Sequence, residues 1–310
     1  MGSRNSMRIM VTKRLSSYQR SLRRTGFLIV LPVFLYFALV YWYPLIQAFL
    51  MSFQETIPGL KMKFAGLKTY KVVFTEPLFW VSFLHTLLFS LQAVVLVVLL
   101  ALALAIALNT LRQERLKNIL TLAYILPTLV SLAAAGFIWE WLLHPRYGLA
   151  NQVLGLLSLP AMKFLLDQKQ VIPSLAVING WVRVGFSMLI LLAGLQSIPE
   201  SFFDAAKVDG AKGFTMTWHI TLPLLMPQIG AVTLLEVIFG LKIFDIVYVT
   251  TQGGPAGASE MLMLYLYNNA FRFYRTDKAA VASVFIFLTL LAFGIFQRRI
   301  MYGKKYEYEY

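Results

Sequence analysis

Residues 197–223, SIPESFFDAAKVDGAKGFTMTWHITLP, separate two long apolar stretches, residues 171–195 and 224–249. A helix that crosses a bilayer needs about 20 mainly apolar residues, and each flanking stretch reaches that length. The more polar segment between them is therefore predicted to connect two membrane-spanning helices on one side of a membrane.

The composition of the whole chain also indicates a membrane protein. Of its 310 residues, 59% are hydrophobic and 14% are charged, whereas an ordinary globular chain is about a quarter charged. Six stretches are long and apolar enough to cross a bilayer: residues 27–50, 84–108, 119–142, 171–195, 224–249 and 279–297. We predict an all-α, polytopic membrane protein with six transmembrane helices in residues 27–300, between an N-terminal tail (1–26) and a C-terminal tail (301–310).

The net charge of +14 first suggests nucleic acid as a partner, but Lys and Arg gather on the cytoplasmic side of membrane proteins. With the N-terminus inside, sixteen of the 28 basic residues fall on the inner side, and seven of these precede residue 27. We therefore expect both tails in the cytoplasm, a lipid bilayer around the spans, and no nucleic-acid partner.

Several chemistries lack the residues that they need. The chain has no cysteine and only three histidines, so a thiol-based or His-rich metal site is not expected. It has no Gly-x-x-x-x-Gly-Lys-Ser/Thr loop to hold nucleotide phosphates, and neither His-Glu-x-x-His nor Gly-x-Ser-x-Gly occurs. We expect no enzyme activity and no bound metal or cofactor. If ATP drives the protein, ATP and Mg are bound by a partner.

The connection between the fourth and fifth predicted spans carries helix signals. Ser197 and Glu200 have the spacing of a capping box, so a helix is expected to start near Ile198. Gly210 can adopt the left-handed conformation that ends a helix, and a second amphipathic stretch continues to Ile220. Two prolines, Pro223 and Pro227, are expected to end this element and to set the entry into the next span.

The helix before Gly210 would carry two bulky rings and two alanines into water, beside three charged side chains. These residues are Phe202, Phe203, Ala205 and Ala206, with Asp204, Lys207 and Asp209. Exposed aromatic rings can serve as anchors in the groove of a partner, or they can lie flat among lipid headgroups. The spacing alone leaves both interpretations open.

The same connection contains a spaced pattern: Asp204-Ala205-Ala206, three residues, Gly210, nine residues, Ile220, one residue, and Leu222-Pro223. This pattern resembles the cytoplasmic loop of binding-protein-dependent ABC transporter permeases, in which Glu is usual in place of Asp204. The resemblance implies a coupling helix seated on a separate ATPase subunit. It implies ATPase-coupling roles for Phe202, Phe203, Asp204, Ala205, Ala206, Lys207, Asp209, Gly210, Ile220, Leu222 and Pro223.

Three further segments, residues 64–87, 125–151 and 244–255, are similar to the carbohydrate branch of this family, although Gly is more usual than Gln252. The resemblance implies a type I ABC importer permease in a prokaryotic cytoplasmic membrane, forming half of a pathway for a sugar or oligosaccharide. The implied partners are a second permease subunit in a heterodimer, a dimer of ATP-binding subunits and an extracytoplasmic solute-binding protein.

Ionisable side chains within spans are costly unless they are paired, so they are functional candidates. Asn179, Arg183 and Ser187 recur every four residues and share one helix face, with Trp181 off that line. This face could hydrogen-bond sugar hydroxyls, with Trp181 stacking on a sugar ring. Alternatively, it forms a buried structural network in which Arg183 pairs with Glu236.

Other candidates lie near the end of the fifth predicted span and beyond it. Lys242 and Asp245 are three residues apart, and we expect them to neutralise each other on one helix, although a place on the substrate pathway stays open. Tyr248, Asn268 and Asn269 are further candidate sugar contacts.

Two other functions remain open. A stand-alone secondary transporter or channel could use Arg183, Glu236 and Asp245 as a proton relay, but it leaves the spaced loop pattern unexplained. An ABC importer of a non-sugar such as glycerol phosphate could use Arg183 to hold the anion.

Overall fold

The computed structural model describes residues 21–22, 24–56 and 62–303. Most of the predicted N-terminal tail and the last seven residues of the predicted C-terminal tail lie outside this part of the chain. Within it the regular structure is helical, apart from a short antiparallel hairpin of β1 (Gln54–Glu55) and β2 (Lys63–Phe64). The prediction of a helical protein is therefore confirmed.

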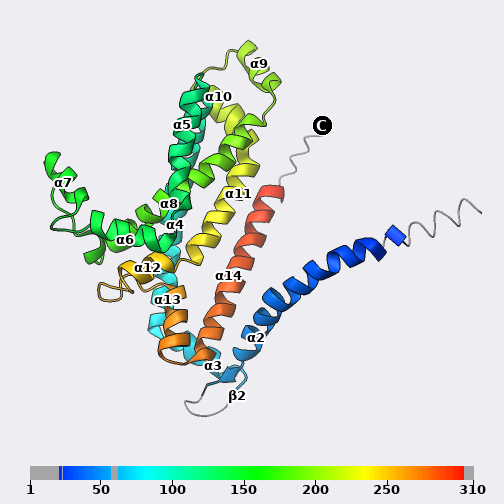
Figure 1. The fold of residues 1–310 in the computed structure, drawn as a ribbon, viewed down its shortest axis with the longest axis vertical. Helices are drawn as coiled ribbons and strands as arrows, with labels where there is room; N and C mark the ends of the chain where they lie inside the picture. The colour runs from blue at the N-terminus through cyan, green and yellow to red at the C-terminus, as the bar shows by residue number, and fades with distance from the viewer. Residues whose placement is uncertain (1–20, 23, 57–61, 304–310) are drawn as a thin grey trace, which may run out of the picture.

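The helices form an elongated bundle (Figure 1). The α-helices are α2 (Tyr43–Met51), α3 (Lys68–Thr75), α4 (Pro77–Thr110), α5 (Glu114–Ile125), α6 (Leu132–Leu142), α7 (Leu149–Leu156), α8 (Val171–Gln196), α9 (Glu200–Val208), α10 (Phe214–Met216), α11 (Leu222–Leu241), α12 (Asp245–Thr250), α13 (Leu262–Tyr267) and α14 (Thr276–Gly303). The other turns are η1 (Ala38–Trp42), η2 (Leu126–Leu129), η3 (Phe164–Leu166), η4 (Thr217–Thr221) and η5 (Asn268–Arg272), of which η2 and η3 are 3-10 helices and the rest π-helices. α9 lies at one end of the molecule, and α3 lies with the hairpin at the opposite end.

Four helices among the described residues are long and apolar enough to cross a membrane: Arg24–Met51, Pro77–Thr110, Val171–Gln196 and Thr276–Ile300. They correspond to the first, second, fourth and sixth predicted spans. A fifth crossing is reached only if two helices joined at a sharp bend count as one. The six-span count therefore stays a prediction.

The third predicted span is bent. Glu114–Leu129 and Leu132–Leu142 meet at 100°. Pro127 lies in the turn that ends the first arm, and Ser131 is extended and begins the second. The Ser131 hydroxyl accepts a hydrogen bond from the Ala134 N–H at 3.2 Å, which caps α6. The apolar length of residues 119–142 predicted one continuous helix. The sequence gives little warning of the bend, because Ser131, which caps α6, is a single polar residue within an apolar stretch.

The fifth predicted span is divided into two helices. α11 ends at Leu241 and α12 begins at Asp245, while Phe244 between them leaves the helical conformation at φ −140°. The break matters for the site because it changes the relative directions of side chains on its two sides. An i, i+3 relationship across it no longer places two residues on one helix face.

The expected stop at Pro223 and Pro227 is wrong, because helix continues from α10 through η4 and through both prolines in α11. A proline has no N–H and its ring crowds the carbonyl four residues earlier. Directly before Pro223, the chain adopts a π turn in which the Leu222 N–H bonds to the Thr217 oxygen five residues back. The wider turn accommodates the proline without ending the helix.

α4 and α8 form the centre of the bundle and pack along much of their length. Small residues allow this close approach, as is usual between helices in membranes. Ala101 and Ala105 of α4 are fully buried. A Cβ at Gly180 of α8 would lie 2.8 Å from the Leu96 side chain, and one at Gly185 would lie 2.0 Å from the Tyr124 backbone oxygen.

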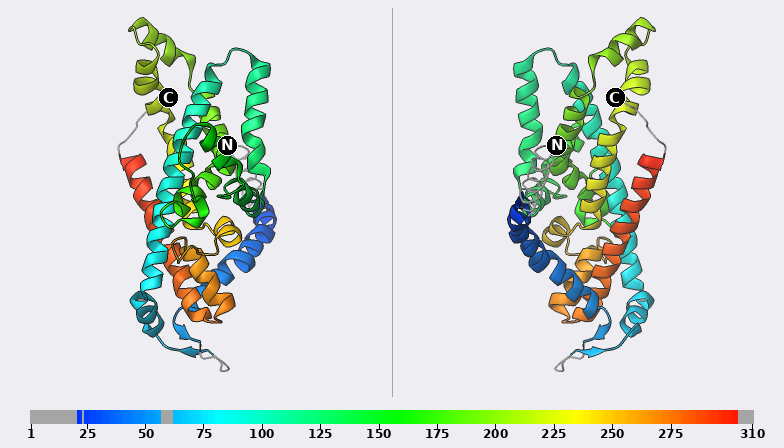
Figure 2. Two further views of the ribbon diagram at one scale, coloured as in Figure 1. Left: turned by 90° about the vertical axis from the view of Figure 1, so that its left-hand side faces the viewer. Right: turned by 90° about the vertical axis from the view of Figure 1, so that its right-hand side faces the viewer.

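The N-terminal helix, Arg24–Met51, diverges from the rest of the bundle in Figure 1, and it runs obliquely to the long axis in the side views of Figure 2. None of its most apolar window is buried. A surface so apolar needs lipid or another chain to cover it. This exposure fits a chain that is one part of a larger membrane assembly.

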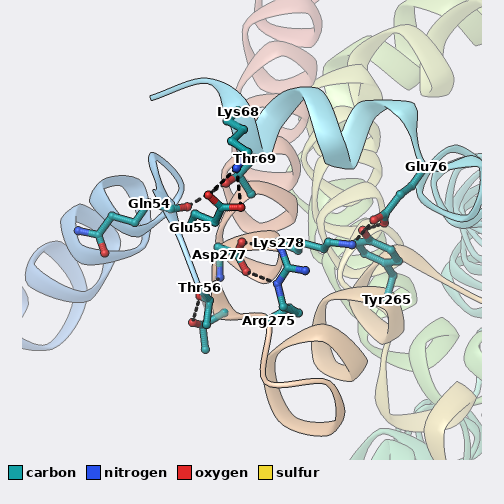
Figure 3. A network of polar contacts seen from close by, with 11 residues as sticks. Gln54, Glu55, Thr56, Lys68, Thr69, Glu76, Tyr265, Arg275, Asp277 and Lys278 are labelled. Carbon is teal, nitrogen blue, oxygen red and sulfur yellow. Dashed lines mark hydrogen bonds and ion pairs between the residues drawn. The ribbon is translucent and has the colours of Figure 1, made fainter. Parts of the chain in front are cut away.

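Polar contacts join the segments at the hairpin end of the bundle (Figure 3). The Tyr265 hydroxyl of α13 donates to Glu76 Oε2 at 2.6 Å, and Lys278 of α14 pairs with the other carboxylate oxygen. Burial and the neighbouring carboxylate raise the pKa of the Tyr265 hydroxyl, which stays a donor. Further ion pairs there are Lys68–Glu55 and Arg275–Asp277.

Candidate functional site

The predicted coupling helix exists as α9, but it starts differently from the expectation. α9 begins at Glu200 with Pro199 at its N-cap, and no side chain caps it. The Ser197 hydroxyl donates instead to the Gly194 oxygen at 2.7 Å. The capping box was therefore a wrong prediction, because Ser197 closes the end of α8 and Pro199 fixes the start of α9.

The predicted end of this helix is confirmed. Gly210 has φ +82°, in the left-handed region. Its N–H bonds to the Lys207 oxygen at 3.0 Å, and the Ala211 N–H bonds to the Ala206 oxygen at 2.9 Å. This pair of hydrogen bonds is the Schellman motif, which turns the chain sharply after a helix. Gly210 therefore fixes the direction in which the chain leaves α9.

α9 lies at the end of the molecule (Figure 1), and it exposes apolar side chains there. Phe202 is 41% exposed and Val208 is 88% exposed, while Phe203 is half-buried and Ala206 is buried. The remaining candidates on this helix and its end, Asp204, Ala205, Lys207 and Asp209, are exposed. Asp204 and Lys207 form an exposed ion pair at 2.9 Å.

The segment after α9 extends this apolar surface. Phe214 and Trp218 stack with their ring centroids 5.8 Å apart, and they are 78% and 57% exposed. Ile220, Leu222 and Pro223 are half-buried where the helix returns to the bundle. Sequence reasoning missed Val208, Phe214 and Trp218, although their apolar character in a polar loop was a usable signal.

The predicted pairing of Arg183 with Glu236 is confirmed. Arg183 Nε and Nη2 lie 2.7 Å and 3.1 Å from the two Glu236 oxygens, and the Ser187 hydroxyl donates to Glu236 Oε1 at 2.8 Å. The Arg183 guanidinium also lies 3.4 Å from the centre of the Phe239 ring. These contacts join α8 to α11 by charge-assisted hydrogen bonds, which are the strong kind.

Two roles were considered for the polar face of α8, sugar binding and a buried structural network. This arrangement favours the structural network. The Glu236 side chain is 1% exposed and the Arg183 side chain 12%. Asn179 is buried two turns before Ser187. Trp181, off that face, packs edge-to-face on Trp139 with a centroid distance of 5.9 Å.

The predicted Lys242–Asp245 ion pair is wrong, because the structure gives no ion pair or hydrogen bond between these two described side chains. The helix break lies between them: Lys242 follows the end of α11, and Asp245 opens α12. Both residues are exposed. The i, i+3 argument failed because it assumed one continuous helix.

The other candidate contacts lie on the half of the bundle away from α9 (Figure 1). Tyr248 packs against Tyr267 with a centroid distance of 5.1 Å. Asn268 Nδ2 donates to Glu260 Oε1 at 3.2 Å. Asn269 is buried, and its side-chain amide donates to the Tyr265 backbone oxygen, so it has a structural role. Among the described residues, no group of His, Cys, Asp and Glu is suited to holding a metal ion.

A helical bundle with four helices that are long and apolar enough to cross a membrane, among the described residues, has the architecture of an integral membrane protein. Residues 97–302 match the family model described as the binding-protein-dependent transport system inner membrane component. The chain belongs to this family, as the resemblance of its loop pattern implied.

Individual relatives agree with this assignment. The chain is 32% identical to the trehalose/maltose transport system permease protein MalF of Thermococcus litoralis, over 86% of this chain and 89% of that protein. It is 30% identical to the sn-glycerol-3-phosphate transport system permease protein UgpA of Agrobacterium fabrum, over 89% of this chain and 96% of that protein. Its fold is similar to a chain in the crystal structure of a bacterial alginate ABC transporter in complex with an alginate pentasaccharide-bound periplasmic protein. That match has a TM-score of 0.80 and 21% identity, and it covers 92% of this chain and 96% of the other.

Proposed function

We propose that the chain is one permease subunit of an ATP-driven ABC importer for a sugar or oligosaccharide. The family match over residues 97–302 supports a transport component, and the relatives named above include a trehalose/maltose permease. The proposed coupling role rests on one observation, the exposed apolar surface of α9 and of the following segment with Phe214 and Trp218. The Schellman turn at Gly210 fixes the direction in which the chain leaves α9. This surface has the form that another protein covers.

In the proposed complex the chain lies in a prokaryotic cytoplasmic membrane with six spans and both termini inside. α9 then faces the cytoplasm and contacts one of two ATP-binding subunits, which hold ATP and Mg. A second permease forms the other half of the pathway, as a heterodimer, and a solute-binding protein delivers substrate at the hairpin end. ATP-driven closure of the partner dimer moves α9, because a ligand shifts an equilibrium only through different contacts in its two states.

We place the substrate pathway near Trp181, Lys242 and Asp245 as a proposal, because these side chains are exposed or half-buried. Arg183 is the less suitable group for an anionic substrate, because two of its nitrogens already bond to Glu236. The glycerol phosphate alternative thereby loses its proposed anchor. The proton-relay alternative loses support, since no hydrogen bond or ion pair of the described residues joins Asp245 to the Arg183–Glu236 pair.

The absence of native cysteine makes a direct test of the coupling contact possible. Val208→Cys on α9 and Phe64→Cys on β2 place single thiols at sites 88% and 83% exposed, at opposite ends of the molecule. Each variant is co-expressed with its cognate ATPase subunits and treated with a photoreactive maleimide. We expect the thiol at position 208 alone to cross-link to the ATPase.

The same two variants test the orientation. A membrane-impermeant maleimide added to intact spheroplasts should label position 64 and not position 208. Cross-linking of the ATPase through position 64, or equal labelling of both positions from outside, would contradict the proposed function.

A further inference from the structure

Aromatic rings from two separate segments meet on the half of the bundle away from α9. Phe244 and Tyr248, at α12, stack with centroids 5.1 Å apart and an interplanar angle of 24°. Tyr267, at the end of α13, lies 5.0 Å from Phe244 and 5.1 Å from Tyr248. Phe271 in η5 lies 5.1 Å from Tyr267. These four rings, which we call the aromatic platform, form one continuous contact set.

The aromatic platform is partly exposed. Phe271 is 64% exposed, and Phe244, Tyr248 and Tyr267 are half-buried. Phe244 and Tyr248 also pack against the central core of the bundle, which holds them in place. Rings that are held by the core and are still partly exposed suit a ligand with a flat apolar face.

Polar groups surround the rim of the platform. The Arg272 guanidinium lies 5.9 Å from the centre of the Tyr248 ring and forms no ion pair with a carboxylate of the described residues. Asn268 donates to Glu260, and its own Oδ1 is buried without a hydrogen-bond partner in the described part of the chain. Burial raises the pKa of the Glu260 carboxyl, and the Asn268 hydrogen bond and the nearby Arg272 charge act in the opposite direction.

We propose that the aromatic platform binds a sugar ring of the passing substrate, with Arg272 placed to contact an anionic substituent of that sugar. A pyranose has an apolar C–H face that stacks on aromatic rings and a rim of hydroxyls that needs donors and acceptors. The guanidinium is suited to a carboxylate, because its planar N–H groups bind both oxygens and it stays charged. Sites that combine apolar rings with a few placed polar groups are the usual form of small-molecule sites.

This inference rests on the proposed importer function, but it concerns a different surface from the coupling loop. The two can therefore fail separately. Cross-linking at position 208 reports on the complex, whereas saccharide binding reports on the platform. A complex that forms the expected cross-link and shows no dependence of saccharide binding on the platform would leave the importer function standing and overturn the platform alone.

The chain offers a closely matched pair of variants. Phe271 belongs to the platform, while Phe273, two residues later, has no ring contact among the described residues, and the two are 64% and 63% exposed. Phe271→Ala and Phe273→Ala thus remove the same side chain from the same surface segment. Neither substitution creates a core cavity, so both variants should fold.

The measurement is saturation-transfer NMR on the assembled complex in nanodiscs without its solute-binding protein, using maltotriose and trigalacturonate as probes. We expect Phe271→Ala to weaken binding of both probes roughly threefold to tenfold, and Phe273→Ala to leave it unchanged. We expect the wild type to bind trigalacturonate more tightly than maltotriose, and Arg272→Gln to remove that preference.

Three results would overturn the proposal. The first is an equal loss of saccharide binding in the Phe271→Ala and Phe273→Ala variants. The second is a wild-type complex that binds neither probe. The third is a Phe271→Ala complex that keeps saccharide binding but loses binding of the solute-binding protein, because the platform would then be a protein docking surface. A trigalacturonate preference that survives Arg272→Gln would refute the role of Arg272.

Discussion

Arg183 on α8 and Glu236 on α11 are joined by two hydrogen bonds, of 2.7 Å and 3.1 Å, across a separation of 53 residues in the chain. The Glu236 carboxylate also accepts a hydrogen bond from the Ser187 hydroxyl. A carboxylate that is 1% exposed is stable only with such partners, because burial of an unpaired charge is expensive. The pair therefore fixes how α8 and α11 pack in the middle of the bundle.

Removing one member of this pair should destabilise the protein strongly. Arg183→Met leaves the buried Glu236 carboxylate without its cation, at an expected cost of about 3–5 kcal/mol in the free energy of unfolding. Thermal unfolding of the purified subunit checks this. The exposed Asp204–Lys207 pair is the control, because Asp204→Ala should cost about 0–1 kcal/mol.

A charge exchange separates pairing from packing at this position. Arg183→Glu alone places two carboxylates together, and the added Glu236→Arg substitution restores one charge of each sign. We expect the double variant to recover part of the folded yield and transport that the single variant loses. If both variants were equally inactive, the pair would matter for more than its charges.

This pair could be predicted from the sequence because its two residues lie in regular helices. The four-residue spacing of Asn179, Arg183 and Ser187 predicted that they share one face of α8. Glu236, an acid without a partner in the following span, was then the predicted partner of Arg183. The Lys242–Asp245 pair used the same reasoning and failed, because the helix breaks between the two residues. Helical periodicity predicts contacts only where the helix is continuous.

The site shows the same limit. Gly210 was predictable because a local sequence signal, glycine after an amphipathic helix, determines the turn. The contact of Tyr248 with Tyr267 depends on the path of the connecting segment between α12 and α13. No local pattern specifies that path. Tyr248 was therefore identified as a candidate without its partner.

Gly210→Val should uncouple ATP hydrolysis from transport. Valine at φ +82° costs about 1–2 kcal/mol, which is enough to displace α9 but is small against the stability of a bundle. We expect transport to fall while the subunit still assembles and substrate no longer stimulates ATP hydrolysis. Reconstituted complexes with paired transport and ATPase assays measure both quantities.

Gly66→Val is the control for this substitution. Gly66 has φ +59° and open space where a Cβ would lie, as Gly210 has, but it lies at the hairpin end of the molecule. The local strain should be similar in the two variants. Substrate-stimulated ATP hydrolysis should survive in Gly66→Val, and its survival in Gly210→Val would remove the coupling role of the turn.

Gly185→Ala should disturb the contact between α8 and the bent third span. A Cβ at this position would lie 2.0 Å from the Tyr124 backbone oxygen and 2.9 Å from the Ile125 Cα. Backbone atoms cannot rotate away, so the helices must separate, at a cost of about 1–3 kcal/mol or more. Gly155→Ala, where nothing lies within 4 Å, should not lower the unfolding temperature, because alanine favours a helix more than glycine does. An equal unfolding temperature for the two variants would show that α8 and the third span are not held at this distance.

Tyr265→Phe tests the polar contacts at the hairpin end, because it removes one hydroxyl and keeps the ring that packs on Phe79. The hydroxyl donates to the Glu76 carboxylate at 2.6 Å, and a hydrogen bond to a charged group contributes about 1.5–3 kcal/mol. We expect a lower unfolding temperature. Tyr274→Phe, at a ring that is 75% exposed, should have no effect. Because Lys278 also pairs with Glu76, Tyr265→Phe combined with Lys278→Met should cost more than either change alone, and a double variant no less stable than Tyr265→Phe would show that Lys278 adds nothing to this contact.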